Sequence, residues 1–404
     1  MNTPALTSQA LPEAAPRRVL AVGAWLKNTA CRLDGTQVRW SPHHGDLAEP
    51  AQCQALEASV QALLAEGPVD AIAHDLHPDF FSTQLARRVA AQLGVPAIGV
   101  QHHHAHVAAL QAEHGVRTPV IGLALDGVGL GTDGVAWGGE LLWGDAARWS
   151  RLGHLTPIRL AGGDVAAREP WRLAAACLHL LGRGNEAPAR LGQYHSDAGV
   201  RVLMTMLDKG LNSPWATGAG RWFDVAAGVL GRGERQAFEA EAAIALEQAA
   251  TAWLQDHPVD PDPADTPIQA DGTLDLLPLM ARLWTLADAL PDPLWPGAAR
   301  FHVALADGLA RWAWGAALAH DCSTVVLGGG CFYNKLLVAR LHEGLARMAH
   351  EQGLPAPRIL QAQALSCGDA GLALGQAWAV AHAASLDADH LAPLPTPHAS
   401  KGHA

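Results

Sequence analysis

Two successive stretches of the chain repeat one order of strand-like and helix-like segments. The first opens with three short apolar segments (RVLAVGAW, TACRLDG and TQVRWSP) that are separated by turn residues, which is typical of a strand meander. It continues with a helical pattern (PAQCQALEASVQALLAEG), a strand (DAIAHD), a second helical pattern (STQLARRVAAQLG) and a strand (PAIGV). The second stretch opens with VIGLALDG, GVAWGGELLWGD and RWSRLGHLTPIRL, and it ends with the strand TVVLGGG, a helix, the strand RILQAQ and a final helix. Each stretch therefore predicts the order βββαβαβα.

This order, given twice, predicts a two-lobed α/β fold of the actin, sugar-kinase and heat-shock-ATPase class, in which two ribonuclease H-like lobes close over a nucleotide. We expect the first lobe to span residues 17–118 and the second residues 119–385. Prolines are dense in residues 256–296, so we expect a surface excursion there that contains one short helix near residues 277–290. Residues 1–16 and 386–404 are expected to be disordered tails.

Charge and targeting signals limit the partners and the location of the protein. The net charge of −11 disfavours a broad electrostatic grip on nucleic acid or on an anionic membrane, and we expect neither as a partner. Arg17 and Arg18 precede an apolar stretch, but Lys27 interrupts it after about eight residues, so it does not have the length of a secretory signal core. The six cysteines form no C-x-x-C pair, which argues against a zinc ribbon. We expect a cytoplasmic protein with reduced thiols.

Four histidines occur within five consecutive residues in the segment QHHHAH. If this segment is helical, His102 and His106 share one face of the helix, because residues four apart are neighbours on its surface. Two imidazoles at this spacing can hold one transition metal. A histidine pair at this spacing is also common as plain surface polarity, but its position directly after an apolar strand favours a metal site.

Two histidines do not complete a metal site, and carboxylates at strand or helix ends are the candidates for the remaining ligands. Asp126 ends an apolar strand in LALDGVGLGTDG, and Asp369 begins the last helix in LSCGDAGLALGQ. An Asp before Gly is also a common turn residue, and an Asp that begins a helix is also a common cap. Two imidazoles and two carboxylates suit Fe(II) or Zn(II) and leave room for a substrate oxygen.

Glycine-rich turns offer backbone that could approach phosphate oxygens. One lies between two strands at residues 126–134, and another, which contains Gly329 and Gly330, joins an apolar strand to a helix. Neither matches the P-loop pattern, which argues against a P-loop enzyme. Asp164 and Asp224 stand beside glycines or at helix starts, where the residue types alone do not distinguish a site from helix caps and surface ion pairs.

Taken together, these motifs resemble one family, the hydrogenase-maturation carbamoyltransferases known as HypF. The segments that carry the resemblance occur in the family's order: QHHHAH, ALDGVGLGTDGVAWGGE, LAGGDVAAREPWR, GRWFDVAA, FEAEAAIALE, GGGCFYNKLL and GDAGLALGQ. The early segments WLKNT, HHGDL and HDLHPDFFST are similar to the family's ELKNT, HIGDL and DLHPDY signatures. The resemblance extends over nearly the whole chain apart from its two ends.

The resemblance implies a reaction and a partner. HypF-like enzymes use carbamoyl phosphate and ATP to make carbamoyl adenylate, and they transfer its carbamoyl group to the C-terminal cysteine thiol of HypE. The product is the precursor of the cyanide ligands of nickel–iron hydrogenases. The nucleophile would be the partner's thiolate, so Cys331 and Cys367, which lie near the site motifs in sequence, are expected to be packing residues.

The resemblance also implies roles for individual residues. One divalent metal, Fe or Zn, would lie between the lobes on His102, His106, Asp126 and Asp369. The adenosine would contact Asp224, Glu239, Gly329 and Asn334, with Gly330 in the same turn. The carbamoyl and phosphate groups would lie near Gly162, Gly163 and Asp164, and Lys27 and Asn28 would form part of the phosphate edge. Lys27 and Asp164 would be the catalytic residues.

Departures from the family pattern change these expectations in two respects. Full-length members carry an acylphosphatase-like domain, a Cys-rich zinc-finger region and a carbamoyl-adenylating domain ahead of this region, and the chain has no signature of them. This predicts a truncated or minimal form that receives carbamoyl adenylate from a separate adenylating domain or forms it inefficiently. In addition, the acid of ELKNT is replaced by Trp25, and the glycine of the family's Y-E-G-x-A-A pattern is replaced by Ala240.

Other functions remain open at this point. A sugar-kinase-like phosphotransferase would have the same fold, but it needs a catalytic Asp and Mg²⁺ and no His-x-x-x-His pair. A carbamoyl-dependent transferase that modifies tRNA or a small molecule is a closer relative, but the acidic charge and QHHHAH favour the hydrogenase branch. A non-enzymatic module would bind the partner or hold a metal without turnover.

Overall fold

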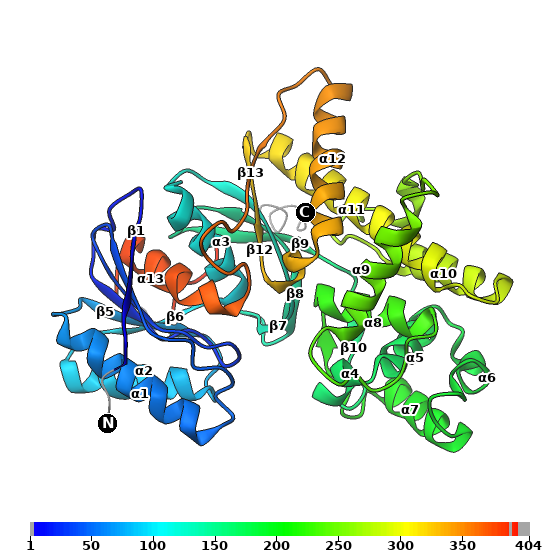
Figure 1. Ribbon diagram of the computed structural model, residues 1–404, viewed down its shortest axis with the longest axis horizontal. Helices are drawn as coiled ribbons and strands as arrows, with labels where there is room; N and C mark the ends of the chain where they lie inside the picture. Colours follow the sequence, from blue (N-terminus) through cyan, green and yellow to red (C-terminus); the bar gives the residue numbers. More distant parts are fainter. Residues whose placement is uncertain (1–3, 388–389, 395–404) are drawn as a thin grey trace, which may run out of the picture.

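A six-stranded sheet forms the first lobe of the computed structural model, which describes residues 4–387 and 390–394 (Figure 1). Its strands lie in the order β1-β4-β3-β2-β5-β6, with β2, β3 and β4 antiparallel and β2, β5 and β6 parallel. The elements of this lobe are β1 (Thr7–Ala10), β2 (Val19–Ala21), β3 (Cys31–Asp34), β4 (Gln37–Trp40), α1 (Pro50–Ala65), β5 (Ala71–Asp75), α2 (Phe81–Leu93), β6 (Ala97–Val100) and α3 (His102–His114).

The second sheet repeats the pattern of the first. Five of its seven strands pair in the order β9-β8-β7-β12-β13, in which β7, β8 and β9 are antiparallel and β7, β12 and β13 are parallel. Its elements are β7 (Val120–Leu130), β8 (Ala136–Gly144), β9 (Trp149–His154), β12 (Thr324–Gly328), η3 (Gly330–Tyr333), α12 (Lys335–Glu351), β13 (Arg358–Leu360), η4 (Asp369–Gly371) and α13 (Leu372–His382). The prediction of two related lobes is confirmed, because the same strand order occurs twice.

A long helical insertion between β9 and β12 enlarges the second lobe (Figure 1). It comprises β10 (Ile158–Arg159), α4 (Asp164–Arg168), α5 (Pro170–Leu180), η1 (Gly184–Glu186), α6 (Ala187–Leu191), α7 (Asp197–Lys209), β11 (Trp215–Ala216), α8 (Ala219–Val229), α9 (Glu241–Trp253), η2 (Pro263–Asp265), α10 (Leu277–Ala289) and α11 (Leu294–Ala319). These helices share one large apolar core with the inner face of the second sheet.

The central strands β2 and β5 of the first sheet are buried on both faces, which explains why they read as continuous apolar runs, whereas the outer strands β1 and β4 are partly exposed. On β2, Leu20 faces the core shared with α1 and α2, while Val19 and Ala21 face the opposite core, which contains α13. Helix α13 thus covers the first sheet, although it follows the last strand of the second. Figure 1 shows this helix in red-orange against the blue strands.

Helix α3 makes the reciprocal exchange. It follows the last strand of the first sheet and packs on β7 and β12 of the second, where Val107 and Leu110 join Val326 in a separate core. The two exchanged helices also pack against each other. The division into residues 17–118 and 119–385 therefore follows the chain but not the packing, since each lobe is covered by the final helix of the other.

The structure corrects the prediction for both ends of the chain where it describes them. Residues 7–10 form strand β1, which pairs with the whole of β4, and Leu11 beyond it is buried. Near the other end, His390 forms a bridge with Gly99 of β6, and Leu391 is buried. An unpaired sheet edge favours such additions, because its backbone groups need partners. The rest of the predicted tails, residues 1–3, 388–389 and 395–404, lies outside the described residues.

The proline-rich segment of residues 256–296 is more than a surface excursion. Its predicted helix exists as α10, but Leu279, Met280 and Leu283 are fully buried against α8 and α11. The prolines occupy the flanking turns and the first turn of the helix, where a missing backbone N–H does no harm. Within residues 4–387 and 390–394, no helix has both the length and the apolar character needed to cross a membrane.

Candidate metal centre

The histidine segment begins helix α3, and its local sequence explains where the helix starts. Gln101 is the N-cap, and its side chain accepts a hydrogen bond of 2.8 Å from the backbone N–H of His104. The helical conformation places His102 and His106 one turn apart on the same face. Both side chains are buried, because α3 lies between the second sheet and α13.

Asp126 lies at an irregularity in strand β7. The register with β8 shifts between Leu125 and Gly129, so three residues of β7 face the single residue Gly138. A bulge of this kind re-aims a side chain locally. Gly138 makes the irregularity possible, since a Cβ atom there would lie 2.8 Å from the carbonyl oxygen of Asp126.

Asp369 begins the short helix η4, directly before α13. The loop that leads to it is fixed by Glu113 at the end of α3, whose carboxylate accepts hydrogen bonds from the backbone N–H groups of Gln363, Ala364 and Leu365. Helix α3 therefore carries two of the candidate ligands and also fixes the approach to a third.

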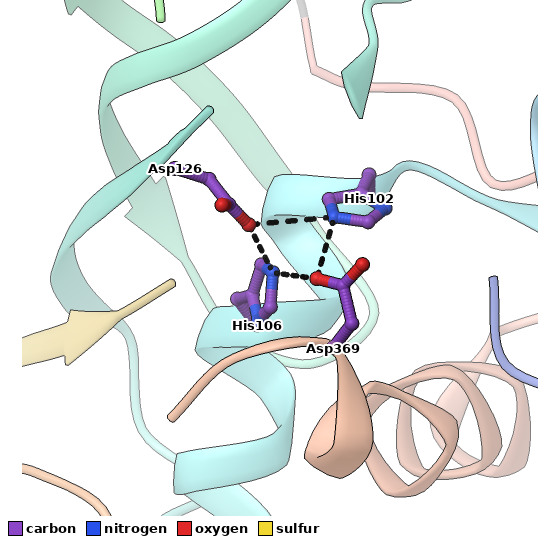
Figure 2. Close-up of side chains that lie close together, drawn as sticks. All are labelled: His102, His106, Asp126 and Asp369. Carbon is purple, nitrogen blue, oxygen red and sulfur yellow. Dashed lines mark hydrogen bonds and ion pairs between the residues drawn. The ribbon is translucent and has the colours of Figure 1, made fainter. Parts of the chain in front are cut away.

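Four side chains meet where these elements converge, and Figure 2 shows them pointing toward one another: His102, His106, Asp126 and Asp369. His106 Nε2 lies 2.9 Å from Asp126 Oδ2 and 3.6 Å from Asp369 Oδ1. His102 Nε2 lies 3.6 Å from Asp126 Oδ2 and 3.5 Å from Asp369 Oδ1. One nitrogen or oxygen from each of the four lies within 4.8 Å of all the others.

The charges in this cluster stabilise one another. Burial alone would raise the pKa values of both carboxyls, but the neighbouring imidazoles outweigh burial and hold the pKa of Asp126 well below its usual range. The pKa of Asp369 is also lowered, for the same reason. Burial likewise opposes the imidazolium of His102, but Asp369 and Asp126 raise its pKa well above the usual range. The structure thus combines two carboxylates with two basic imidazoles.

This donor set fits a divalent cation. Metal–ligand bonds of about 2.0–2.2 Å in a tetrahedral arrangement separate neighbouring ligand atoms by roughly 3.4 Å, which is close to three of the four nitrogen–oxygen distances above. His102 Nε2 is buried and has no hydrogen-bond partner among the described residues. A buried imidazole nitrogen that faces two carboxylates without a hydrogen bond to either is a position that a proton or a metal cation would complete.

Lys27 lies on the hairpin between β2 and β3, which is held against the Asp369 segment. Thr29 Oγ1 donates a hydrogen bond of 2.8 Å to the carbonyl of Ala370, and the buried Gln376 of α13 bonds both backbone groups of Gly23. The negative charges of the Asp369 and Asp126 carboxylates contribute to raising the pKa of the Lys27 ammonium. The hairpin therefore places a cation beside the cluster.

Glu239 reaches Lys27 from the second lobe. Its carboxylate forms an ion pair of 2.8 Å with the Lys27 ammonium, and both side chains are largely exposed. The next residue, Ala240, has a left-handed backbone (φ +61°), although the family pattern has glycine there. The glycine-to-alanine departure therefore keeps a backbone shape that glycine would adopt without strain.

Two of the residues predicted to contact the nucleotide already make hydrogen bonds within the protein. The fully buried amide of Asn28 donates to the carbonyls of Val22 and Ala24, and its oxygen lies 2.8 Å from His44 Nδ1. Asn334 caps α12 by accepting from the backbone N–H of Leu337, and its amide lies 3.0 Å from His302 Nε2. The Asn28 amide therefore uses both of its N–H groups within the protein, whereas the Asn334 amide uses one and keeps a second N–H.

Asp224 and the glycine turn after β12 lie on the second lobe, and the turn packs against the strand that carries Asp126. Asp224 is buried, 3.1 Å from Arg221 and within hydrogen-bond reach of Gln236, and burial raises its pKa to about 6 despite both neighbours. A Cβ at Gly330 would lie 3.3 Å from Asp126 Oδ1, and one at Gly329 would lie 2.3 Å from the Leu125 carbonyl. The turn thus needs glycine in order to pack against the strand that carries Asp126.

Gly162, Gly163 and Asp164 are not in the cluster. Both glycines have left-handed backbones (φ +96° and +62°), and Asp164 begins α4 with an exposed side chain. Figure 1 shows α4 well apart from α3. The structure therefore brings the four predicted metal ligands together. Gly162, Gly163 and Asp164 lie outside the cluster at the start of α4, and the other end of this short helix is linked to Asp224 through Gln236, which donates to the Ala167 carbonyl and to the Asp224 carboxylate.

Sequence reasoning missed Asp75, which contacts the cluster from outside. It ends strand β5, and its Oδ2 lies 2.8 Å from His102 Nδ1. The signal was present in the motif HDLHPDFFST, where a carboxylate follows a buried strand, but nothing in the sequence connects that strand end with His102.

Comparisons with known proteins place this geometry in a family. Residues 122–376 match the family model of the second subdomain of the Kae1-like carbamoyltransferase domain, and residues 14–113 match that of the HypF Kae1-like domain. The chain is 54% identical over 380 residues to a carbamoyltransferase HypF homologue of Cupriavidus necator, covering 93% of this chain and 95% of that protein.

Longer relatives match over part of their length. Carbamoyltransferase HypF2 of the same organism is 45% identical over 386 residues, which cover 89% of this chain and 46% of that protein. A crystal structure of full-length HypF in its phosphate- and nucleotide-bound form superposes with a TM-score of 0.81 at 28% identity, covering 93% of this chain and 47% of that one. The chain thus spans about half the length of these two proteins.

Proposed function

The chain belongs to the HypF family of carbamoyltransferases, and from this premise we propose that it transfers a carbamoyl group from carbamoyl adenylate to the C-terminal cysteine of a HypE-like maturation protein. The observation that carries the proposal is the convergence of two imidazoles and two carboxylates from separate elements on one point between the lobes.

The proposed reaction is an acyl transfer to sulfur. The partner's thiolate attacks the carbonyl carbon of the carbamoyl group, a C–S bond forms, and the C–O bond to the AMP phosphate breaks. The electron pair of that bond leaves with AMP, and the product is a thiocarboxamide on the partner. The reaction is redox-neutral and needs no further reactant.

The metal would be held by His102, His106, Asp126 and Asp369, and iron or zinc suits this donor set. When it is bound, a divalent cation supplies Lewis-acid polarisation of a carbonyl or phosphoryl oxygen. The two histidines are buried, while both carboxylates are partly exposed. The exposed side of the cluster is therefore the side from which a substrate oxygen would approach.

The thiols of the chain near the site do not supply the nucleophile. Burial raises the pKa of Cys331 well above its ordinary value, and it raises the pKa of Cys367 to about 11. Both thiols therefore stay protonated at neutral pH and are poor nucleophiles. This supports transfer to a cysteine that the partner provides.

The nucleotide end of the substrate would lie between the Lys27 hairpin and the second lobe. Lys27 would face the phosphate, since its ammonium can exchange the exposed Glu239 carboxylate for a phosphate oxygen. Asp224 and the backbone of Gly329 and Gly330 would face the adenosine. A full-length relative binds phosphate and nucleotide in its crystal structure, which supports a nucleotide in this family's site.

Transfer from preformed carbamoyl adenylate to the cysteine-tailed partner tests the proposal. With the wild-type enzyme we expect a thiocarboxamide on the partner's cysteine, detected as the mass increase of one carbamoyl group. With His102→Ala the rate of transfer should fall at least ~100-fold. A His257→Ala variant serves as the control, because that exposed side chain lies outside the cluster. No transfer by the metal-loaded wild type would disprove the function, and partner binding without transfer would indicate a docking module.

A second arm addresses the source of the activated donor. Carbamoyl phosphate and ATP replace carbamoyl adenylate, with and without a separate carbamoyl-adenylating domain. We propose that transfer is efficient only when that domain is added. Equally fast transfer in its absence would show that this chain forms carbamoyl adenylate itself.

A further inference from the structure

The motif HDLHPDFFST has no role in the function proposed so far, yet its first carboxylate contacts a proposed ligand of the metal centre. Asp75 ends strand β5, where its side chain is buried on the first lobe. Its Oδ2 accepts a hydrogen bond of 2.8 Å from His102 Nδ1, and its Oδ1 accepts one of 2.9 Å from the backbone N–H of His77. Both oxygens of this carboxylate are therefore used as acceptors.

The other nitrogen of the same imidazole faces the cluster. His102 Nε2 is buried without a hydrogen-bond partner among the described residues, and it lies 3.5 Å from Asp369 Oδ1 and 3.6 Å from Asp126 Oδ2. A carboxylate that accepts from Nδ1–H keeps the proton on that nitrogen, leaves the lone pair on Nε2 and fixes the plane of the ring.

From this geometry we infer that Asp75 is a positioning residue for the metal centre, which holds His102 in the orientation and tautomer that bind a divalent cation through Nε2. The inference rests on the metal site proposed above, and it assigns a role to a residue that is bonded to one proposed ligand, His102, without being a ligand itself.

The motif also fixes Asp75 itself. The turn that follows β5 carries His77, whose ring stacks on Phe80 at 4.2 Å, and Phe80 packs on Trp25 of the Lys27 hairpin at 5.5 Å. The hydrogen bond from the His77 backbone to Asp75 closes this turn. One short segment therefore joins His102, on one side, to the hairpin that carries Lys27, on the other.

Asp75→Asn tests the inference with the smallest change of shape. An asparagine has one acceptor oxygen, whereas Asp75 uses two. If that oxygen keeps the bond to the His77 N–H, the amide NH₂ faces His102 Nδ1 and favours the tautomer with its proton on Nε2, where the metal would bind. If the oxygen turns to His102 instead, the turn at His77 loses its bond.

The measurement is the affinity for zinc, by competition with a chromophoric chelator, together with the visible spectrum of the cobalt-substituted protein. We expect Asp75→Asn to weaken zinc binding by about 10–100-fold and to shift the cobalt bands. Asp79→Asn is the matched control, since it makes the same substitution four residues away on an exposed side chain of the same turn. It should leave affinity and spectrum unchanged.

The alternative is that Asp75 only caps the turn after β5. In that case Asp75→Asn would lower the thermal stability of the metal-free protein and leave zinc affinity and the cobalt spectrum as in the wild type, which would overturn the inference. A wild type that binds no zinc would overturn both the metal centre and the inference. Should Asp75→Asn fail to fold, the zinc-loaded wild type decides. It should show a slowly exchanging ring N–H proton that disappears in His102→Gln, and its absence would overturn the inference.

Discussion

Lys27 has a left-handed backbone, with φ at +48°, which costs a residue with a side chain about 1–2 kcal/mol. Lys27 lies on a hairpin that is held by hydrogen bonds on both sides of it, from Gln376 to Gly23 and from Thr29 to the Ala370 carbonyl. A glycine would adopt this conformation without strain. The strained residue therefore indicates a use for the ammonium beside Asp369 rather than a requirement of the turn.

We expect Lys27→Gly to separate stability from activity. Relief of backbone strain offsets the added freedom of glycine in the unfolded chain and the loss of an exposed ion pair, so the free energy of unfolding should stay within about 1 kcal/mol of the wild type. The rate of carbamoyl transfer should fall at least ~10-fold, because the cation near the phosphate is lost. Chemical denaturation and the transfer assay measure the two quantities.

The control for this variant is Asp321→Gly. Asp321 has the same kind of backbone (φ +47°) and an exposed side chain on the turn before β12. Its replacement should have a similar effect on stability and none on transfer. Full activity of Lys27→Gly would show that the ammonium has no role in the reaction.

Asp224 carries a penalty that depends on pH. Burial raises its pKa from 3.8 to about 6, so the folded state prefers the protonated carboxyl. Below pH 4 the carboxyl is protonated in both the folded and the unfolded protein, so it does not lower the free energy of unfolding. Between pH 4 and pH 6 the loss of stability grows, and above pH 6 it stays constant. Two pKa units correspond to roughly 3 kcal/mol.

Asp224→Asn should remove that penalty. The variant's gain in unfolding free energy over the wild type should be near zero at pH 4 and about 2–3 kcal/mol at pH 7. Affinity for the nucleotide should fall, which would explain why a destabilising carboxylate is present. Denaturant titrations at several pH values measure the gain, and Asp256→Asn, at an exposed position, should show none. A gain that is independent of pH would contradict the assignment of the titration to Asp224.

At the scale of elements, the crossing of α3 and α13 sets the distance between the histidines and Asp369. Gly375 of α13 lies against α3 so closely that a Cβ would come within 1.8 Å of the Ala105 carbonyl oxygen. No side-chain rotation relieves such a contact, because the backbone fixes the position of a Cβ atom and the atom it meets is a backbone oxygen. The helices must move apart if any side chain is added at this point.

We expect Gly375→Ala to destabilise the fold by about 1–3 kcal/mol or more. It should also weaken metal binding, because His102 and His106 belong to α3, which would be displaced. Thermal unfolding and zinc affinity are the measurements. Gly315→Ala is the control, because Gly315 lies in helix α11 with open space around its Cβ position. That change should stabilise the protein by about 0.5–1 kcal/mol. Equal effects of the two substitutions would contradict the role of the close crossing.

The order of helices and strands could be predicted from the sequence, but the places where two of the helices pack could not. The order βββαβαβα was visible because strands buried on both faces form continuous apolar runs. The exchange of α3 and α13 between the lobes was not, because both helices are buried on nearly every side and present no one-sided apolar stripe that would identify a partner. A lobe boundary drawn along the chain does not reveal this exchange, for the same reason.

Individual site residues divide along a similar line. His102, His106, Asp126 and Asp369 could be selected by their chemistry, since their residue types and their places at element ends narrowed the choice. Asn28 and Asn334 also matched motifs, but only coordinates reveal that their amides are used within the protein. Asp75 required knowledge of which strand end lies beside α3.

At the scale of the whole molecule, the metal centre would link elements that cover or form both lobes. His102 and His106 come from α3, Asp126 from the second sheet, and Asp369 from the segment before α13, which covers the first sheet. An unfolded chain separates these ligands, so a metal bound to all four must be released on unfolding. Metal binding should therefore stabilise the fold according to the ratio of free metal to Kd.

At a free zinc concentration of 100 times Kd, the free energy of unfolding should rise by about 2.7 kcal/mol, and excess chelator should reverse the rise. His106→Ala and Asp369→Ala should each lose the response, since they remove ligands contributed by different elements. His257→Ala should retain it, and hydrogen exchange should slow at residues 366–371 in the metal-loaded wild type only. If both ligand variants showed the full rise in unfolding free energy with zinc, the cation would bind elsewhere among the 21 histidines. A metal link between the lobes would then have no support.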